Sequence, residues 1–121
     1  MKIADANIIL RYLLDDDELS YKAANLIKDN KICIPNEVFA EIVYVLEKVY
    51  RVEREEISNI LLELLDYKNI EVYDLELIKT ALKLYAKRRL DFVDTLLYAY
   101  KKVKNYEVYT FDKKLNNLLE S

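Results

Sequence analysis

Short apolar runs alternate along the chain with longer segments in which apolar residues recur at the spacing of a helix face. Four short runs are strand candidates, at residues 2–6, 31–34, 70–73 and 107–111. A helical pattern follows each run, and strands that alternate with helices favour a parallel sheet covered on both faces. The pattern therefore predicts an α/β fold with a short central parallel sheet of four or so strands flanked by helices.

The helical segments are predicted from their periodicity and from the residues that begin and end them. They span residues 7–14, 18–28, 35–50, 53–66, 74–88 and 91–104, with a last short helix from residue 112 or 113. Pro35 suits a first helical position, and Asp74 and Asp91 suit N-caps. The acidic turn Asp15-Asp16-Asp17 separates the first two helices. No linker or low-complexity stretch interrupts the pattern, so residues 1–121 are predicted to form one domain.

An asparagine stands before three of the four predicted strands. Asn30, Asn69 and Asn105 each follow a helical segment. A helix commonly ends at a residue in the left-handed conformation, usually glycine and sometimes asparagine. Because the chain has no glycine, we expect asparagine to adopt this conformation at all three joints.

Composition narrows the chemistry that is available. The absence of histidine removes imidazole catalysis and imidazole metal ligands, and the single Cys33 excludes a disulfide or a cysteine-based zinc site. Cys33 lies in an apolar run and is expected to be a buried, inert thiol. The net charge of −3 gives no support to broad, non-specific nucleic-acid binding. No signal peptide or membrane-spanning run is evident, which predicts a cytoplasmic protein.

Two acidic residues follow predicted strands directly. Asp5 ends the first strand and Asp112 ends the fourth, so both are expected at the same edge of the sheet, where ligands bind in open α/β folds. The alternative is that each carboxylate only caps the helix that follows. Asp74 also follows a strand and is assigned to capping.

Three further acids lie on predicted helices. Glu41 falls beside the stripe Val38, Ile42, Val45 and Val49, where an unpaired buried carboxylate is costly, so it requires either a metal ion or a salt bridge. Asp91 and Asp94 lie on one side of the first turn of another helix, where the helix dipole favours acids. Capping accounts for Asp91 more completely than for Asp94.

Taken together, these acids predict a divalent-metal site. Converging carboxylates cannot all stay ionised without a cation, and Mg²⁺ or Mn²⁺, as one or two ions, accepts oxygen ligands. If the chain is an enzyme, such a metal site is nearly all the catalytic chemistry that its composition offers.

Four segments together resemble a known family. They are residues 5–14, 38–46, 91–97 and 108–113, and their order and spacing are similar to the four motifs of the PIN-domain ribonucleases. The length is similar to that of the compact, VapC-like toxins of toxin–antitoxin pairs. The departure is Asn105, which stands where the family has a glycine before its last strand. The resemblance implies a three-layer PIN-like fold.

The resemblance also implies roles for individual residues. Asp5, Glu41 and Asp94 would be the core metal-binding acids, Asp112 a fourth and more variable one, and Asp91 an auxiliary one. Asn7 and Thr110 would orient the acids or a substrate phosphate. The implied reaction is endonucleolytic cleavage of single-stranded RNA, in which a metal-activated water attacks the phosphodiester and Asp94 or Asp112 orients that water.

The surface residues and the resemblance together suggest which molecules the chain binds. Basic residues that are candidates for RNA phosphates are Arg11, Lys87–Arg89, Lys101, Lys102, Lys113 and Lys114. An ordinary solvated surface is the favoured alternative for them. A second apolar strip of Phe39, Val43, Leu46 and Tyr50 suggests burial against a homodimer partner or an antitoxin helix. The competing hypotheses are an RNA-processing PIN nuclease without an antitoxin, and a non-catalytic α/β interaction module.

Overall fold

The computed structural model describes residues 1–15 and 18–121, so Asp16 and Asp17 of the predicted acidic turn lie outside the described residues. The described strands are β1 (Lys2–Ile3), β2 (Ile32–Cys33) and β3 (Ile70–Glu71). The described helices are α1 (Ala6–Leu14), α2 (Glu18–Asp29), α3 (Asn36–Lys48), α4 (Arg54–Leu65), α5 (Leu75–Lys87), α6 (Phe92–Lys104) and α7 (Lys113–Leu119). Each helix boundary lies within two residues of the prediction.

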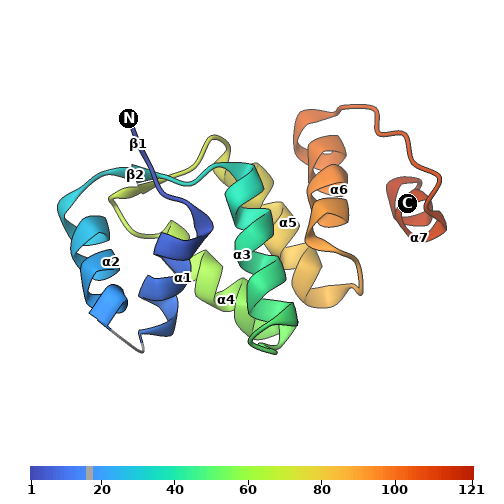
Figure 1. Cartoon of the computed structure of the whole chain (residues 1–121). Helices are drawn as coiled ribbons and strands as arrows, with labels where there is room; N and C mark the ends of the chain where they lie inside the picture. Colours follow the sequence, from blue (N-terminus) through green and yellow to red (C-terminus); the bar gives the residue numbers. More distant parts are fainter. Residues whose placement is uncertain (16–17) are drawn as a thin grey trace.

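The three strands form a small parallel sheet at one end of the molecule (Figure 1). The order is β1-β2-β3, with Lys2 opposite Ile32 and Ile32 opposite Ile70. The α/β class and the parallel pairing are therefore confirmed. The helices line up beside the sheet, with α2 and α1 near it and α6 and α7 at the opposite end (Figure 1).

The predicted fourth strand is wrong for the described structure. Residues 107–111 form no strand, and Tyr109 and Phe111 are 87% and 104% exposed. Asn105 ends α6 in the left-handed conformation (φ 59°), and the chain then runs away from the sheet toward α7 (Figure 1). Alternation of apolar residues identifies an extended segment, but a strand also needs a partner edge, which local sequence does not specify.

The predicted left-handed asparagines are confirmed only at Asn105. Asn30 and Asn69 do not have positive φ angles. Their side-chain amides instead bind the last carbonyls of α2: Asn30 Nδ2 donates to Leu26 O at 2.8 Å, and Asn69 Nδ2 donates to Ile27 O. A carboxamide can satisfy free helix carbonyls in this way without a left-handed backbone.

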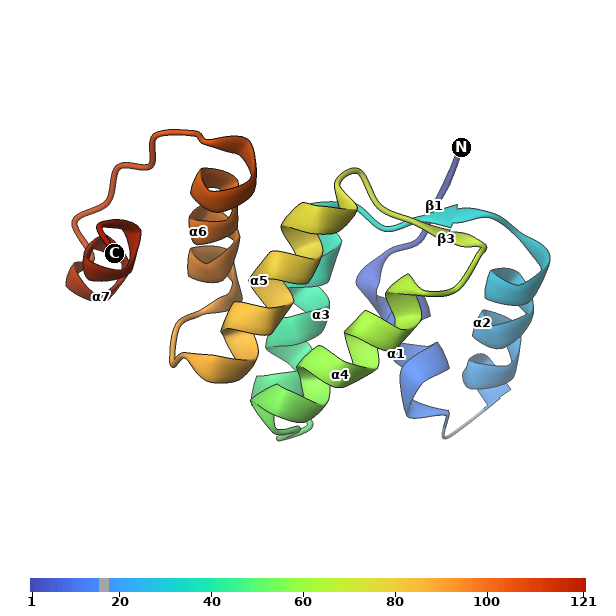
Figure 2. The same cartoon turned by 180° about the vertical axis from the view of Figure 1, so that it is seen from behind.

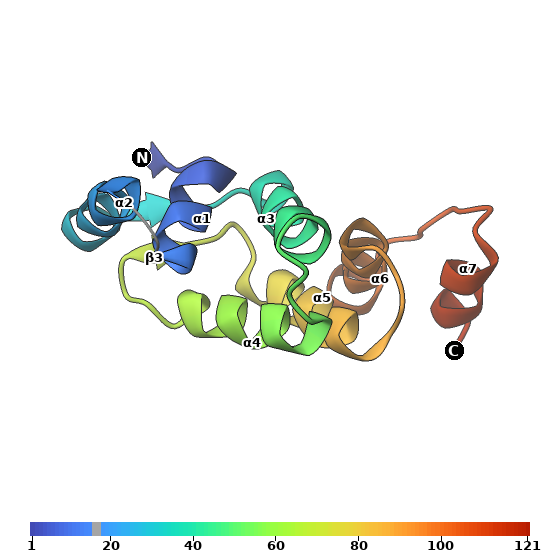
Figure 3. The same ribbon diagram turned by 60° about the horizontal axis from the view of Figure 1, so that its bottom comes forward.

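Helix α3 is central, which explains its wide apolar surface. It packs against α1, α4 and α6, and Phe39, Val43 and Leu46 are buried in the chain's own core. Viewed from below, α3 lies between α1 and α6 (Figure 3). The strip that suggested an external partner is therefore largely an internal surface, and only its last member, Tyr50, is exposed at 48%.

Arg54, at the start of α4, holds together the connection between α5 and α6. Its guanidinium donates to three backbone carbonyls, those of Tyr85 (3.0 Å), Arg88 (2.9 Å) and Leu90 (2.6 Å). It also lies 3.9 Å from the centre of the Tyr85 ring and 3.8 Å from Glu47 on α3. The adjoining helices α4 and α5 run side by side (Figure 2).

The buried hydroxyl of Tyr85 completes this cluster by donating to Glu47. Burial works to raise the pKa of Glu47, but the Tyr85 hydrogen bond and the charges of Arg54 and Lys48 outweigh it, so the pKa lies below its ordinary value. Burial and the same hydrogen bond raise the pKa of Tyr85.

Among the described residues, no helix is long and apolar enough to cross a membrane.

We expect Arg54→Ala to lower the free energy of unfolding by about 2–4 kcal/mol, because three carbonyls lose charge-assisted hydrogen bonds and Glu47 loses a cation. Arg54→Lys should recover only part of this, since an ammonium cannot reproduce the planar fork. Urea denaturation measures the effect, and the exposed Arg89→Ala is the control. Equal stability of Arg54→Ala and Arg89→Ala would contradict the role of Arg54.

Candidate active site

Asp5 lies between β1 and α1 and caps the helix. Its Oδ1 accepts a hydrogen bond from Ile8 N at 3.0 Å, and the side chain is otherwise exposed. Asn7, also exposed, is the second residue of α1, and Arg11 lies partly buried further along the same helix. Three of the residues that the sequence assigned to the site therefore lie on one short segment.

Glu41 is exposed on α3, which corrects the argument from burial. The buried face of α3 is formed by Phe39, Ile42, Val43 and Leu46, and Glu41 lies outside it. Val49, the last member of the stripe predicted beside Glu41, is 62% exposed, so the buried face of α3 differs from the predicted stripe. A carboxylate in water needs no partner, so Glu41 is not forced by the fold to bind a cation or a base.

Asp91 and Asp94 begin α6 and behave differently from the other acids. Asp91 is the N-cap residue, yet its side chain makes no capping hydrogen bond. Capping therefore does not account for its carboxylate, contrary to the sequence-based interpretation. Burial raises the pKa of the Asp94 carboxyl, and the negative charges of Asp112 and Asp91 raise it further. The charges of Asp91 and Asp112 thus both act on Asp94.

Asp112 reaches this group from the start of α7. Its Oδ1 accepts from Leu115 N at 2.9 Å, so it caps α7, and its own N–H donates to Thr110 Oγ1 at 3.0 Å. Asn116 Nδ2 donates to Thr110 O at 3.0 Å and fixes the turn. Thr110 therefore holds the backbone of Asp112, and Asn116 is a supporting residue that the sequence pattern did not indicate.

The structure brings only part of the predicted acids together. Helix α1, which Asp5 caps, and helix α7, which Asp112 caps, lie toward opposite ends of the molecule in all three views (Figures 1–3). Within residues 1–15 and 18–121, no three His, Cys, Asp or Glu side chains are close enough to hold a metal ion. The carboxylates have the right chemistry for a hard cation, but this arrangement does not assemble them, and no catalytic step follows from it.

The structure confirms the prediction that Asp74 caps a helix. Its Oδ1 accepts from Leu77 N at 3.1 Å, and its carboxylate pairs with Lys104 at 2.5 Å. The Lys104 contact and the Leu77 hydrogen bond lower the pKa of Asp74. This acid is occupied in holding α5 to the end of α6.

The structure describes an α/β domain in which Asp5, Asp91 and Asp112 are the N-cap residues of α1, α6 and α7. A family model described as the PIN domain matches residues 2–119, so the chain belongs to the PIN domain family. The chain is also 33% identical to a protein named VapC ribonuclease from Aquifex aeolicus (strain VF5), over 98% of this chain and 92% of the relative. No solved structure gives a significant match.

We expect Asp94→Asn to stabilise the fold slightly at neutral pH, by a few tenths of a kcal/mol, because it removes one of three like charges. A raised carboxyl pKa means that the folded state loses stability as pH rises through that pKa. The gain should therefore vanish in acid, where Asp94 is protonated in the wild type as well.

Urea denaturation near pH 7 and again near pH 3 measures this gain, with Asp66→Asn as a control acid at the exposed end of α4. A destabilised Asp94→Asn variant at neutral pH would contradict the electrostatic account.

Proposed function

We propose that this chain is an endoribonuclease that hydrolyses phosphodiester bonds in single-stranded RNA. The observation that carries the proposal is the raised pKa of Asp94, caused by burial and then by the charges of Asp112 and Asp91, in a chain of which residues 2–119 match the PIN domain. A partly buried carboxylate that neighbouring acids also repel destabilises a fold, and such perturbed acids are concentrated at functional sites. The relative named VapC ribonuclease supports the same activity.

The acids are proposed to act with Mg²⁺ or Mn²⁺. Support comes from the type of donor, since carboxylate oxygens are typical ligands of hard divalent ions. The proposed set is Asp5, Glu41, Asp94 and Asp112, with Asp91 as an additional acid. In this proposal Asn7, Thr110 and Arg11 position the substrate or the acids.

Cleavage of a single-stranded RNA oligonucleotide tests the activity. We expect cleavage with Mg²⁺ or Mn²⁺, none with EDTA, and a loss of about 100-fold or more in Asp94→Asn and Asp5→Asn, because a metal site supplies several kcal/mol of transition-state stabilisation. Asp66→Asn, an exposed acid outside the four motifs, is the matched control and should cleave like the wild type. Cleavage that survives EDTA or Asp94→Asn would refute the proposed site.

Metal binding is tested without turnover by calorimetric titration of Mn²⁺ into the protein. We expect binding to the wild type and to Asp66→Asn, and strongly weakened binding to Asp94→Asn and to Asp112→Asn. Binding that is unchanged in both of the latter variants would place the metal elsewhere, even if RNA is cleaved.

We further propose that the chain is the toxin of a toxin–antitoxin pair, active in the cytoplasm and assembling as a homodimer. The support is its compact length and the relative named VapC ribonuclease. An RNA-processing nuclease without an antitoxin is the alternative. A short neighbouring reading frame whose product binds this chain and blocks cleavage would favour the toxin over the RNA-processing nuclease. The homodimer is tested separately by light scattering, which would give twice the monomer mass.

A further inference from the structure

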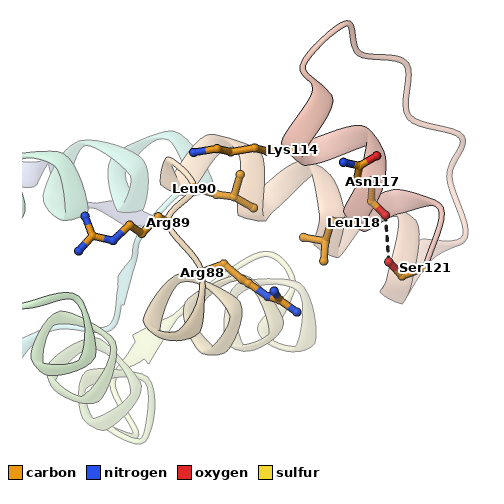
Figure 4. A pocket seen from close by; sticks show the side chains of 7 residues that line it. All are labelled: Arg88, Arg89, Leu90, Lys114, Asn117, Leu118 and Ser121. Atoms are coloured by element: carbon orange, nitrogen blue, oxygen red, sulfur yellow. Dashed lines mark hydrogen bonds between the residues drawn. The ribbon is translucent and has the colours of Figure 1, made fainter.

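A basic cavity adjoins the acidic cluster. It has a volume of about 400 Å³ and lies between the end of α5, the connection to α6, and α7 (Figure 4). Its cationic lining is Arg88, Arg89 and Lys114. Leu90 lies between Lys114 and Arg88 and supplies apolar surface, and Leu118 and the Asn117 amide lie on the α7 side of the cavity; Arg88 and Arg89 extend in opposite directions (Figure 4).

The three cations are not used elsewhere in the described part of the chain. The ion pairs found among residues 1–15 and 18–121 engage Lys31, Lys48, Arg54 and Lys104, and none engages Arg88, Arg89 or Lys114. No acidic side chain lines the cavity. In a chain of net charge −3, three unpaired cations around one cavity form a local site for an anion.

A neighbouring cavity provides a contrast. Arg88 and Arg89 border it as well, but Glu47, Glu53 and Glu55 also line it. Its basic residues are therefore balanced by acids, and Arg54 within it is bound to carbonyls. Of these two cavities, the one beside α7 has no Asp or Glu side chain in its lining.

The position of the cavity connects it with the acids. Arg88, Arg89 and Leu90 directly precede Asp91 in the chain, and Lys114 follows Asp112 by two residues. The two segments that carry these acids thus also carry the cations. The backbone of the first segment is fixed, since the carbonyls of Arg88 and Leu90 are held by Arg54.

We propose that this cavity binds a backbone phosphate of single-stranded RNA next to the point of cleavage, with the attached nucleoside against Leu90 and Leu118. The chemistry fits this ligand, because guanidinium groups bind phosphate oxygens through paired hydrogen bonds and lysine adds a point charge. The proposal rests on the proposed ribonuclease function and names where its substrate is held outside the acidic cluster.

The test is the binding of a fluorescently labelled single-stranded RNA in EDTA, followed by anisotropy at several salt concentrations. The variant is Arg88→Gln, Arg89→Gln and Lys114→Gln combined. The matched control combines Lys22→Gln, Lys68→Gln and Lys83→Gln, which removes three exposed lysines. Lys22 and Lys68 are far from the cavity in sequence, and Lys83 lies on another face of α5. Both variants change the net charge by the same amount.

We expect the cavity variant to raise Kd at least about tenfold, because each charge-assisted hydrogen bond to phosphate is worth that much. The slope of log K against log salt should fall by about 0.7, the contribution of one phosphate contact on a single strand. The control should change both quantities much less. In cleavage assays the cavity variant should raise KM and leave kcat unchanged, as expected for uniform binding.

Equal effects of the two triple variants would overturn the proposal, since general electrostatics would then explain the binding. If the triple variant unfolds, the exposed Lys114→Gln alone should raise Kd and lower the salt slope, and no change in either quantity would refute the cavity. Binding without cleavage by the wild type would refute the ribonuclease function and leave the cavity standing. Cleavage with unchanged binding by the cavity variant would refute the cavity alone.

Discussion

The contacts of Arg54 are the interaction on which the arrangement of the site depends. One guanidinium bridges α4 to the α5–α6 connection through three carbonyls, stacks on the Tyr85 ring and lies beside Glu47 of α3. Tyr85 is fully buried and packs edge-on against Phe92, the first residue of α6. A charged group is thereby used at the meeting point of four helices, where its hydrogen bonds offset the cost of partial burial.

The start of α6 depends directly on this cluster. Arg54 holds the carbonyl of Leu90, and the next residue, Asp91, is the N-cap of α6. The helix direction, and with it the place of Asp94, is therefore set from outside the acidic cluster. This separation matters physically, because three repelling carboxylates cannot hold one another in place and require a framework that is stable without them.

The predictability of the fold differs between local and non-local features. Helix boundaries followed from periodicity and from caps such as Asp5, Asp74 and Asp112, whose side chains all accept the hydrogen bonds that their type predicts. The absent fourth strand concerns pairing across the fold, which local alternation does not determine. Asn30 and Asn69 show a further ambiguity, because an asparagine after a helix can either adopt a left-handed backbone or use its amide to bind helix carbonyls, which for Asn69 belong to α2 and not to the preceding α4.

The acidic residues also differ in how far local sequence can predict their surroundings. The sequence pattern could indicate Asp91, Asp94 and Asp112, and their electrostatic coupling supports their grouping. It could not establish that Glu41 is exposed, because the buried face of α3 depends on three neighbouring helices rather than on α3 alone. Nor could it indicate Arg54, whose partners are backbone carbonyls that any residue supplies.

Helix α7 carries both an acid of the acidic cluster and a cation that lines the cavity. A polyanionic substrate is repelled by clustered carboxylates, so a site built from acids needs nearby cations that do not neutralise them beforehand. The short α7 supplies one of each, with Asp112 at its N-terminus and Lys114 within its first turn. Its docking rests on the buried Leu115 and Leu119 and on Lys101 Nζ, which donates to Leu119 O at 2.6 Å. The packing of two leucines against the domain therefore fixes both the acid that raises the pKa of Asp94 and the cation that faces the cavity.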